Sequence, residues 1–223
     1  MKTWQLLPEI SASMPFQMAL DELCFRRAKN GSLTESAPPI IRFYFSSGPW
    51  ITVGYSQTAG EINSVPVCKR LTGGGRVRHG SDLIFSLIAR KSDHESFTSV
   101  RISYLKIHEA VKSAFEALGR SPRMYRCDEE LPRGEDCFRF PIATDLSLNG
   151  RKVAGGSQKR SSGFLLHQES IQDLHGIPYR DLIRELSRAF EQVFAARLVS
   201  TDLSPELLRE AEESAGAREG VAV

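Results

Sequence analysis

Cys137 and Lys152 stand on either side of an Asn149-Gly150 dipeptide, and they are the residues of this chain best suited to chemistry. A thiol is a weak nucleophile until it loses its proton, and a nearby ammonium favours the thiolate. Asn-Gly between two short alternating segments predicts a β-hairpin. Such a hairpin would carry Lys152 near the start of its second strand, close to a loop that holds Cys137. The pattern permits a Cys/Lys pair that performs acyl transfer.

The four cysteines of the chain differ in their surroundings. A single cysteine is more often a small buried hydrophobic residue than a catalyst. Cys24 lies in an apolar helical pattern and Cys68 in a strand pattern, so both are expected to be structural. Cys137 lies in a charged stretch with Pro and Gly, which is typical of a loop. Cys127 lies between Arg and Asp and is therefore the rival nucleophile.

Glycines gather at two places that could bind a ligand. A lone lysine on a hairpin is usually a solvated surface charge, but Gly155-Gly156 follows Lys152, and paired glycines let the backbone approach a ligand closely. Three glycines at residues 73–75 expose N–H groups suited to a carbonyl, a thioester or a phosphate. Their spacing is that of neither a P-loop nor a dinucleotide-binding loop. His79 follows as a possible general base, or as a polar residue at a strand end.

The composition bounds the class of protein. The chain has 223 residues, 41% hydrophobic and 25% charged, which is typical of a soluble globular protein. A net charge of +2 is no signature of nucleic-acid binding, and no apolar stretch predicts a membrane span or a signal peptide. Unevenly spaced cysteines favour reduced thiols in a cytoplasm. We expect one catalytic domain over residues 1–223 with a frayed tail at 217–223.

Hydrophobic periodicity predicts an α+β fold, in which grouped strands form a sheet with helices packed on it. Helices are expected at residues 15–29, 104–118, 180–194 and 205–215. Strands are expected at residues 40–45, 50–54, 67–71, 82–89, 123–126 and 163–171, with the hairpin at 145–148 and 151–154.

Four segments in order carry a resemblance to a known family: Met-Ala-Leu-Asp-Glu at 18–22, residues 41–57, the glycine loop to His79, and Gly-Arg-Lys-Val-Ala-Gly-Gly-Ser-Gln at 150–158. The chain resembles the biotin/lipoate A/B protein ligases, which include lipoate–protein ligases and octanoyltransferases. The resemblance implies a fold similar to the biotin protein ligase catalytic domain, with a mixed sheet and a small second sheet around an acyl tunnel. It also implies these substrate-binding residues: Arg70, Thr72, Gly73, Gly74, Gly75, Val77, His79, Gly155, Gly156 and Ser157.

Cys137 decides the subtype within that resemblance. Octanoyltransferases of the Gram-positive type carry a cysteine before the lysine in a Cys-Phe-x-x-Pro context, and this chain has Cys137-Phe138-Arg139-Phe140-Pro141. The other octanoyltransferase type places its cysteine after the hairpin, where this chain has none. The short stretch after residue 194 also favours a transferase over ligases that carry a C-terminal accessory domain.

The resemblance implies a ping-pong reaction. The Cys137 thiolate would take an octanoyl group from acyl carrier protein, and a lysine of a lipoyl domain or of glycine cleavage H protein would then accept it. Lys152 would favour the thiolate and stabilise the oxyanion, with help from backbone N–H groups. The thioester keeps the acyl group activated, so no cofactor and no metal site are expected. A close variant would move a lipoyl group from one lipoyl-type protein to another.

Two other readings stay open. One is an ATP-dependent lipoate ligase, which would use ATP and Mg²⁺ and leave Cys137 incidental. The other is a non-catalytic protein that binds acyl proteins. Arg76 and Arg78 depart from the family pattern, which has a small and an apolar residue there. Strand alternation predicts that both arginines face an acidic protein partner while Val77 lines the pocket; the alternative is a pocket for a different ligand.

Overall fold

The computed structural model describes residues 1–31, 39–58, 64–126, 134, 136–174 and 176–219 of the chain. Its helices are α1 (Met14–Lys29), α2 (Val100–Ala117), α3 (Tyr179–Val193) and α4 (Pro205–Glu219), with the 3-10 turn η1 (Glu95–Thr98) before α2. Its strands are β1 (Lys2–Ala12), β2 (Ile40–Ser46), β3 (Trp50–Val53), β4 (Val67–Lys69), β5 (Val77–His79), β6 (Leu83–Arg90), β7 (Arg123–Met124), β8 (Leu146–Leu148), β9 (Arg151–Ser161), β10 (Phe164–Ile171) and β11 (Ala196–Ser200).

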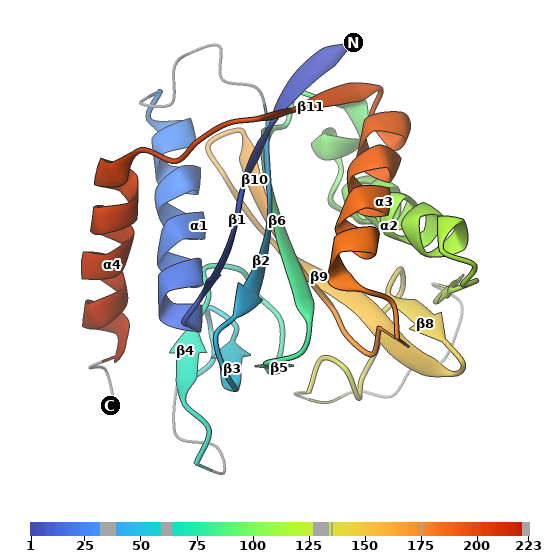
Figure 1. Ribbon diagram of the computed structural model, residues 1–223, viewed down its shortest axis with the longest axis horizontal. Coiled ribbons are helices and arrows are strands. Elements are labelled where there is room, and N and C mark those ends of the chain that lie inside the picture. The colour runs from blue at the N-terminus through green and yellow to red at the C-terminus, as the bar shows by residue number, and fades with distance from the viewer. Residues whose placement is uncertain (32–38, 59–63, 127–133, 135, 175, 220–223) are drawn as a thin grey trace.

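The expected α+β architecture is confirmed. Within the described residues, eight strands form a mixed sheet in the order β11-β1-β2-β6-β10-β9-β8-β7, and β4-β3-β5 form a small second sheet. Helices α1 and α4 cover one face of the large sheet, and α2 and α3 cover the other (Figure 1). The small sheet lies beside the N-terminal end of α1, near the lower end of β2 in this view.

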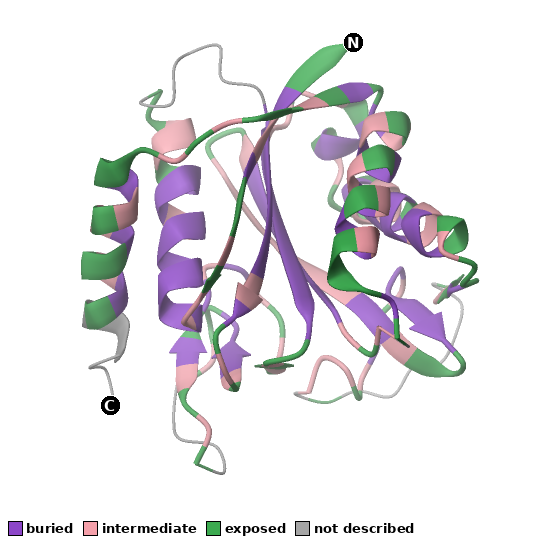
Figure 2. Cartoon of the chain, in the orientation of Figure 1, coloured by how far each residue is buried: buried purple, intermediate pink, exposed green. Residues whose placement is uncertain are grey.

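Apolar side chains fill both layers between sheet and helices. One cluster joins the sheet to α2 and α3, and a second joins the opposite face to α1 and α4. Figure 2 shows the burial along the central strands and on the inner sides of the helices. A third, small cluster around Met14, Met18, Tyr44 and Ile84 lies where α1 meets the small sheet. This third cluster matters most here, because it borders the site described below.

Strands β1 and β11, which lie at one edge of the large sheet, were not predicted from the sequence. Strand β1 contains Pro8, and its register with β2 shifts between Leu7 and Ile10. This irregularity breaks the simple alternation by which a strand is recognised. Strand β11 pairs with β1 in parallel at the outer edge and is short. Both strands owe their form to pairing with residues far away in the chain.

The predicted helices exist, with different ends. The N-cap of α2 is Ser99, whose side chain accepts a hydrogen bond from the Ile102 N–H, so α2 begins earlier than the apolar stripe indicated. Its first turn exposes Val100 and Ile102, which is why hydrophobic periodicity missed it. Helix α4 continues to Glu219, beyond the expected residue 215, whereas residues 220–223 of the expected tail lie outside the described residues.

Strands β8 and β9 form the expected hairpin. Asn149 and Gly150 both have positive φ values, 52° and 76°, as a two-residue turn that matches the strand twist requires. Strand β9 continues to Ser161, well past the predicted end, because it pairs with β10 along its length. The hairpin therefore carries Lys152 at the start of β9, the strand that joins β8 to β10 in the large sheet.

No helix in the described part of the chain is both long and apolar enough to cross a membrane.

Candidate active site

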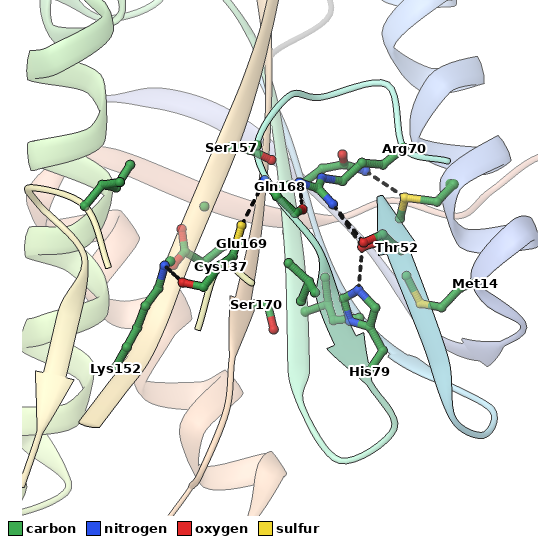
Figure 3. A pocket seen from close by; sticks show the side chains of 18 of the residues that line it. Met14, Thr52, Arg70, His79, Cys137, Lys152, Ser157, Gln168, Glu169 and Ser170 are labelled. Carbon is green, nitrogen blue, oxygen red and sulfur yellow. Dashed lines mark hydrogen bonds between the residues drawn. The ribbon is translucent and has the colours of Figure 1, made fainter. Parts of the chain in front are cut away.

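A cavity lies between the large sheet, the small sheet and the start of α1, and it brings together most of the residues predicted from the sequence (Figure 3). The apolar part of the cavity lining is formed by Met14, Met18, Tyr44, Val77 and Ile84. The lining also includes polar residues and glycines: Arg70, Gly74, Gly75, Cys137, Lys152, Gly155, Gly156, Ser157 and Glu169. An apolar chain with a reactive polar end suits this division.

The loop of Cys137 is tied to the glycine loop. A short parallel bridge pairs Asp136 with Arg76, and the Cys137 N–H donates to the Arg76 carbonyl at 3.0 Å. The Cys137 Sγ accepts a hydrogen bond from the Gly75 N–H at 3.1 Å. The thiol is half-buried and lines the cavity. This geometry gives Cys137 the access and the backbone donor that a nucleophile needs.

Lys152 meets Cys137 at its backbone. The Lys152 Nζ donates to the Cys137 carbonyl oxygen at 2.9 Å and lies 2.6 Å from the Asp145 Oδ2. It also lies 5.1 Å from the centre of the Phe138 ring. Burial raises the pKa of Asp145, although Lys152 acts in the opposite direction. The hairpin thus delivers the lysine as predicted, but the ammonium is paired with a carboxylate and bonded to the Cys137 carbonyl.

The paired glycines of β9 make room for charged side chains of the protein itself. A Cβ atom at Gly155 would lie 2.3 Å from the Lys152 Cε, and one at Gly156 would lie 2.2 Å from the Glu169 Oε2. Both distances are far inside van der Waals contact. Both glycines line the cavity, as predicted. The structure adds a second reason for them, which is space for the Lys152–Asp145 pair and for Glu169.

Glu169 is a buried carboxylate in the cavity wall that sequence reasoning missed. Its Oε2 lies 3.0 Å from the His108 Nε2 and 2.8 Å from the His167 Nε2. Burial alone would raise the pKa of Glu169, but the two histidines outweigh it and hold the pKa at about 2. Burial would lower the pKa of His108, but Glu169, together with Asp145 and the Thr144 backbone, raises it above the ordinary value overall. Burial prevails at His167 and lowers its pKa. Glu169 and His108 therefore form an ion pair beside a neutral His167.

Arg70 fixes the shape of the glycine loop. Its Nη2 donates to the carbonyls of Gly73 at 2.6 Å and Gly75 at 2.8 Å. Its Nη1 donates to the carbonyl and to the hydroxyl of Thr52, each at 3.2 Å. Gly74, between the two anchored carbonyls, has a φ of 89°, a conformation that glycine adopts without strain. Arg70 thus holds the loop that presents the Gly75 N–H to Cys137.

His79 is engaged through both ring nitrogens. Its Nδ1 lies 2.7 Å from the Asp82 Oδ2 and its Nε2 lies 2.8 Å from the Thr52 Oγ1. Burial would raise the pKa of Asp82, but His79 and two further donors, Ser170 and the Gly80 N–H, lower it overall. His79 lines the cavity as predicted. His79 therefore holds Thr52, and Thr52 in turn contacts the Arg70 guanidinium. These contacts favour a positioning role for His79 over a role as general base.

Thr72 and Ser157 connect the glycine loop to the large sheet. The Ser157 hydroxyl donates to the Thr72 Oγ1 at 2.7 Å, and Thr72 donates to the Gln168 Oε1 at 2.8 Å. Gln168 in turn donates to the Asp21 Oδ2 at 2.7 Å. Ser157 lines the cavity, whereas Thr72 and Gly73 are not among its described lining residues. Thr72 and Gly73 therefore support the site through their hydrogen bonds to Gln168 and Arg70. The motif alone does not distinguish this supporting role from contact with a ligand.

Strand β5 separates its side chains as the alternation predicts. Val77 lines the cavity, and Arg76 and Arg78 are exposed. Cys24 and Cys68 are buried, in agreement with a structural role. Cys127, the rival nucleophile, lies outside the described residues.

Met14, Met18, Glu169 and Asp145 were not selected from the sequence, and the first three of them line the cavity. Met14 and Met18 are one helical turn apart on α1, and that spacing could have indicated a shared face. Glu169 occurs in a strand of otherwise apolar and uncharged residues, so a carboxylate there was the available sign of a special environment. Asp145 comes directly before the hairpin, where an acidic residue is usually explained as part of a turn.

Comparisons with known proteins agree with this geometry. The family model described as the lipoyl protein ligase A/B catalytic domain matches residues 13–172. The chain is 35% identical over 186 residues to the octanoyltransferase LipM of Bacillus subtilis, covering 76% of this chain and 65% of that protein. It is 29% identical over 210 residues to the LipM of Moorella thermoacetica, covering 88% of this chain and 75% of that protein. The chain thus spans 65% of the length of the Bacillus protein.

Solved structures share the fold. A lipoate–protein ligase A bound with ATP superposes with a TM-score of 0.78 at 20% identity, covering 99% of this chain and 97% of that chain. A bipartite lipoate protein ligase from Thermoplasma acidophilum, studied with its E2 lipoyl domain, gives a TM-score of 0.74 at 19% identity, covering 100% and 95%. With the matched residues spanning the glycine loop, Cys137 and the β8–β9 hairpin, the chain belongs to the lipoyl protein ligase A/B catalytic domain family.

Proposed function

We propose that this protein is an octanoyltransferase of protein lipoylation that carries the acyl group on Cys137. The observation that carries the proposal is the position of the Cys137 thiol, which accepts the Gly75 N–H at 3.1 Å in the wall of a partly apolar cavity. The resemblance to LipM proteins supports octanoyl transfer in particular. The acyl chain would extend from Cys137 toward Met14, Met18 and Ile84.

In the first half-reaction, the Cys137 thiolate attacks the thioester carbonyl carbon of octanoyl-acyl carrier protein. A new C–S bond forms, the carbonyl electrons move to oxygen, and the Gly75 N–H is close enough to donate to that oxyanion. Collapse of the tetrahedral intermediate expels the carrier thiolate, which takes up a proton from solvent. A well-placed oxyanion donor lowers such a barrier by about 3 kcal/mol.

In the second half-reaction, the neutral ε-amine of a lysine on a lipoyl-type domain attacks the acyl-Cys137 carbonyl. The C–N bond forms, the C–S bond to Cys137 breaks, and the nitrogen loses a proton, so the products are an amide and the free thiol. Lys152 contributes by holding the Cys137 main chain through its 2.9 Å hydrogen bond. A relative of the same fold was studied with an E2 lipoyl domain, which supports a lipoyl domain as acceptor. Glycine cleavage H protein is a second acceptor of the same class.

Intact mass spectrometry tests the proposal. The purified chain, incubated with octanoyl-acyl carrier protein and no ATP, should gain one octanoyl group that hydroxylamine removes. Cys137→Ala should abolish the adduct, while the matched change Cys127→Ala should leave it. An adduct that persists in Cys137→Ala would contradict the assignment. Octanoylation or lipoylation of a lipoyl domain that requires free acid and ATP would point instead to a ligase.

A further inference from the structure

Arg70 differs from the other buried cations of the site in its partners. Lys152 faces Asp145 at 2.6 Å, His108 faces Glu169 at 3.0 Å, and Arg42 on β2 faces Asp21 at 3.2 Å. Arg70 is 5% exposed, and in the described part of the chain its hydrogen-bond acceptors are carbonyls and one hydroxyl, all of them neutral. Removing a cation from water is costly unless an opposite charge compensates it. A negative charge is therefore expected next to Arg70.

The group next to Arg70 that can supply this charge is the thiol of Cys137. A Cβ atom built on Gly74 would lie 3.0 Å from the Arg70 Nη2 and 3.8 Å from the Cys137 Sγ, so the two groups flank the same small space. Gly75 bridges them as well, because its carbonyl accepts from Arg70 and its N–H donates to Cys137. Figure 3 shows Arg70 and Cys137 among the labelled residues that line the cavity.

The electrostatics point the same way. Burial lowers the pKa of Arg70, and the charge of the neighbouring Cys137 acts in the opposite direction. A guanidinium remains protonated across the physiological range, so Arg70 supplies a constant positive charge and takes no part in proton transfer. By contrast, the carboxylate of Asp145 compensates the positive charge of Lys152, and the Lys152 Nζ donates to the carbonyl of Cys137.

We infer that Arg70 is the cation that stabilises the Cys137 thiolate, and that Lys152 mainly positions the Cys137 loop. This inference rests on the proposed function for its catalytic meaning, since a thiolate is the nucleophile of the first half-reaction. When the thiolate attacks, negative charge moves from sulfur to the carbonyl oxygen of the substrate, and the same guanidinium stays within the site to balance it. Arg70 also keeps the Gly75 N–H in place for that oxygen.

The pH dependence of thiol alkylation tests the inference without any acyl substrate. In a Cys127→Ser background, iodoacetamide labelling of Cys137 is followed by intact mass and peptide mapping across the pH range. Arg70→Met should move the midpoint of the rate profile upward by at least about one pH unit. Lys152→Met should move it by less than about half a pH unit. Arg70→Lys should retain part of the effect, because it keeps the charge and loses the fork.

Chemical rescue separates charge from structure. Guanidinium ion at a concentration far below that which denatures should return the Arg70→Met profile toward the original, and an equal ionic strength of NaCl should not. An unchanged profile in Arg70→Met overturns the inference. If Arg70→Met fails to fold by circular dichroism, Lys152→Met decides alone, and a shift of about one pH unit or more there overturns it. If octanoyl transfer is absent while alkylation depends on Arg70, the proposed function falls and the thiolate assignment stands.

Discussion

The Lys152 ammonium lies 2.9 Å from the main-chain oxygen of Cys137, whereas the Cys137 sulfur takes its hydrogen bond from the Gly75 N–H. The lysine and the glycine loop thus contact Cys137 at two different atoms. One contact holds the backbone, and the other reaches the thiol. Because Asp145 lies 2.6 Å from the same ammonium, the lysine is itself held in place.

Lys152→Met is expected to slow octanoyl transfer by about two orders of magnitude, because a misplaced nucleophile loses near-attack geometry. Lys152→Arg should restore only part of the rate, since the planar guanidinium differs in shape from an ammonium. Single-turnover transfer from octanoyl-acyl carrier protein measures both. Near-normal transfer by Lys152→Met would show that the contact of this lysine with the Cys137 carbonyl is not needed for transfer.

Gly156→Ala should destabilise the fold by about 1–3 kcal/mol, because the new methyl group would collide with the Glu169 carboxylate. The matched control is Gly216→Ala in α4, where a Cβ atom would meet nothing within 4 Å. That change should be neutral or stabilise by up to about 1 kcal/mol, since alanine favours a helix. Urea unfolding of the two variants provides the comparison. Equal free energies of unfolding would show that Glu169 moves aside freely.

Glu169 should contribute to the acid sensitivity of the protein. Its pKa is held at about 2, below the ordinary value of 4.5, so its ion pair stabilises the fold fully above about pH 4.5 and loses that effect as the pH falls toward 2. His108, whose pKa is raised, contributes in the opposite sense, and its stabilisation is lost as the pH rises through that value. Glu169→Gln should lower the thermal stability at pH 6 and flatten its decline between pH 4.5 and 2. A variant with the original slope in that window would remove Glu169 from the acid response.

Arg76 and Arg78 should serve the protein partner. Arg78 on β5 and Arg76 directly before that strand are both exposed while Val77 lines the cavity, and a basic rim attracts an acidic carrier protein. Arg76→Ala with Arg78→Ala should weaken transfer from octanoyl-acyl carrier protein and reduce its salt dependence, while reaction with a small octanoyl thioester stays nearly unchanged.

The control for that double variant is Arg197→Ala with Arg209→Ala, which removes the same charge from the exposed surface of β11 and α4. It should leave transfer from the carrier protein close to the original rate. If the small thioester suffers as much as the carrier protein when Arg76 and Arg78 are removed, the two arginines belong to the chemistry of the pocket.

The sequence determined the parts of this protein that depend on neighbours in the chain. The Asn149-Gly150 turn forms the predicted hairpin because its two residues adopt positive φ values without help from the rest of the fold. The alternation of Arg76, Val77 and Arg78 was enough to separate cavity from solvent. The ordered motifs were enough for the family, and residues 13–172 match it.

Only the tertiary structure decided which groups touch. Glu169 and His108 come from β10 and α2, and neither has a sequence pattern that indicates the other. Lys152 reached the Cys137 loop as predicted, but the choice of the carbonyl over the sulfur depends on Asp145 and on the space left by Gly155. The motif predicted Arg70 only as a ligand-binding residue. That its hydrogen-bond acceptors among the described residues include no carboxylate is seen only in the folded structure. Local pattern fixes backbone conformation, whereas the balance of buried charge is a property of contacts between distant segments.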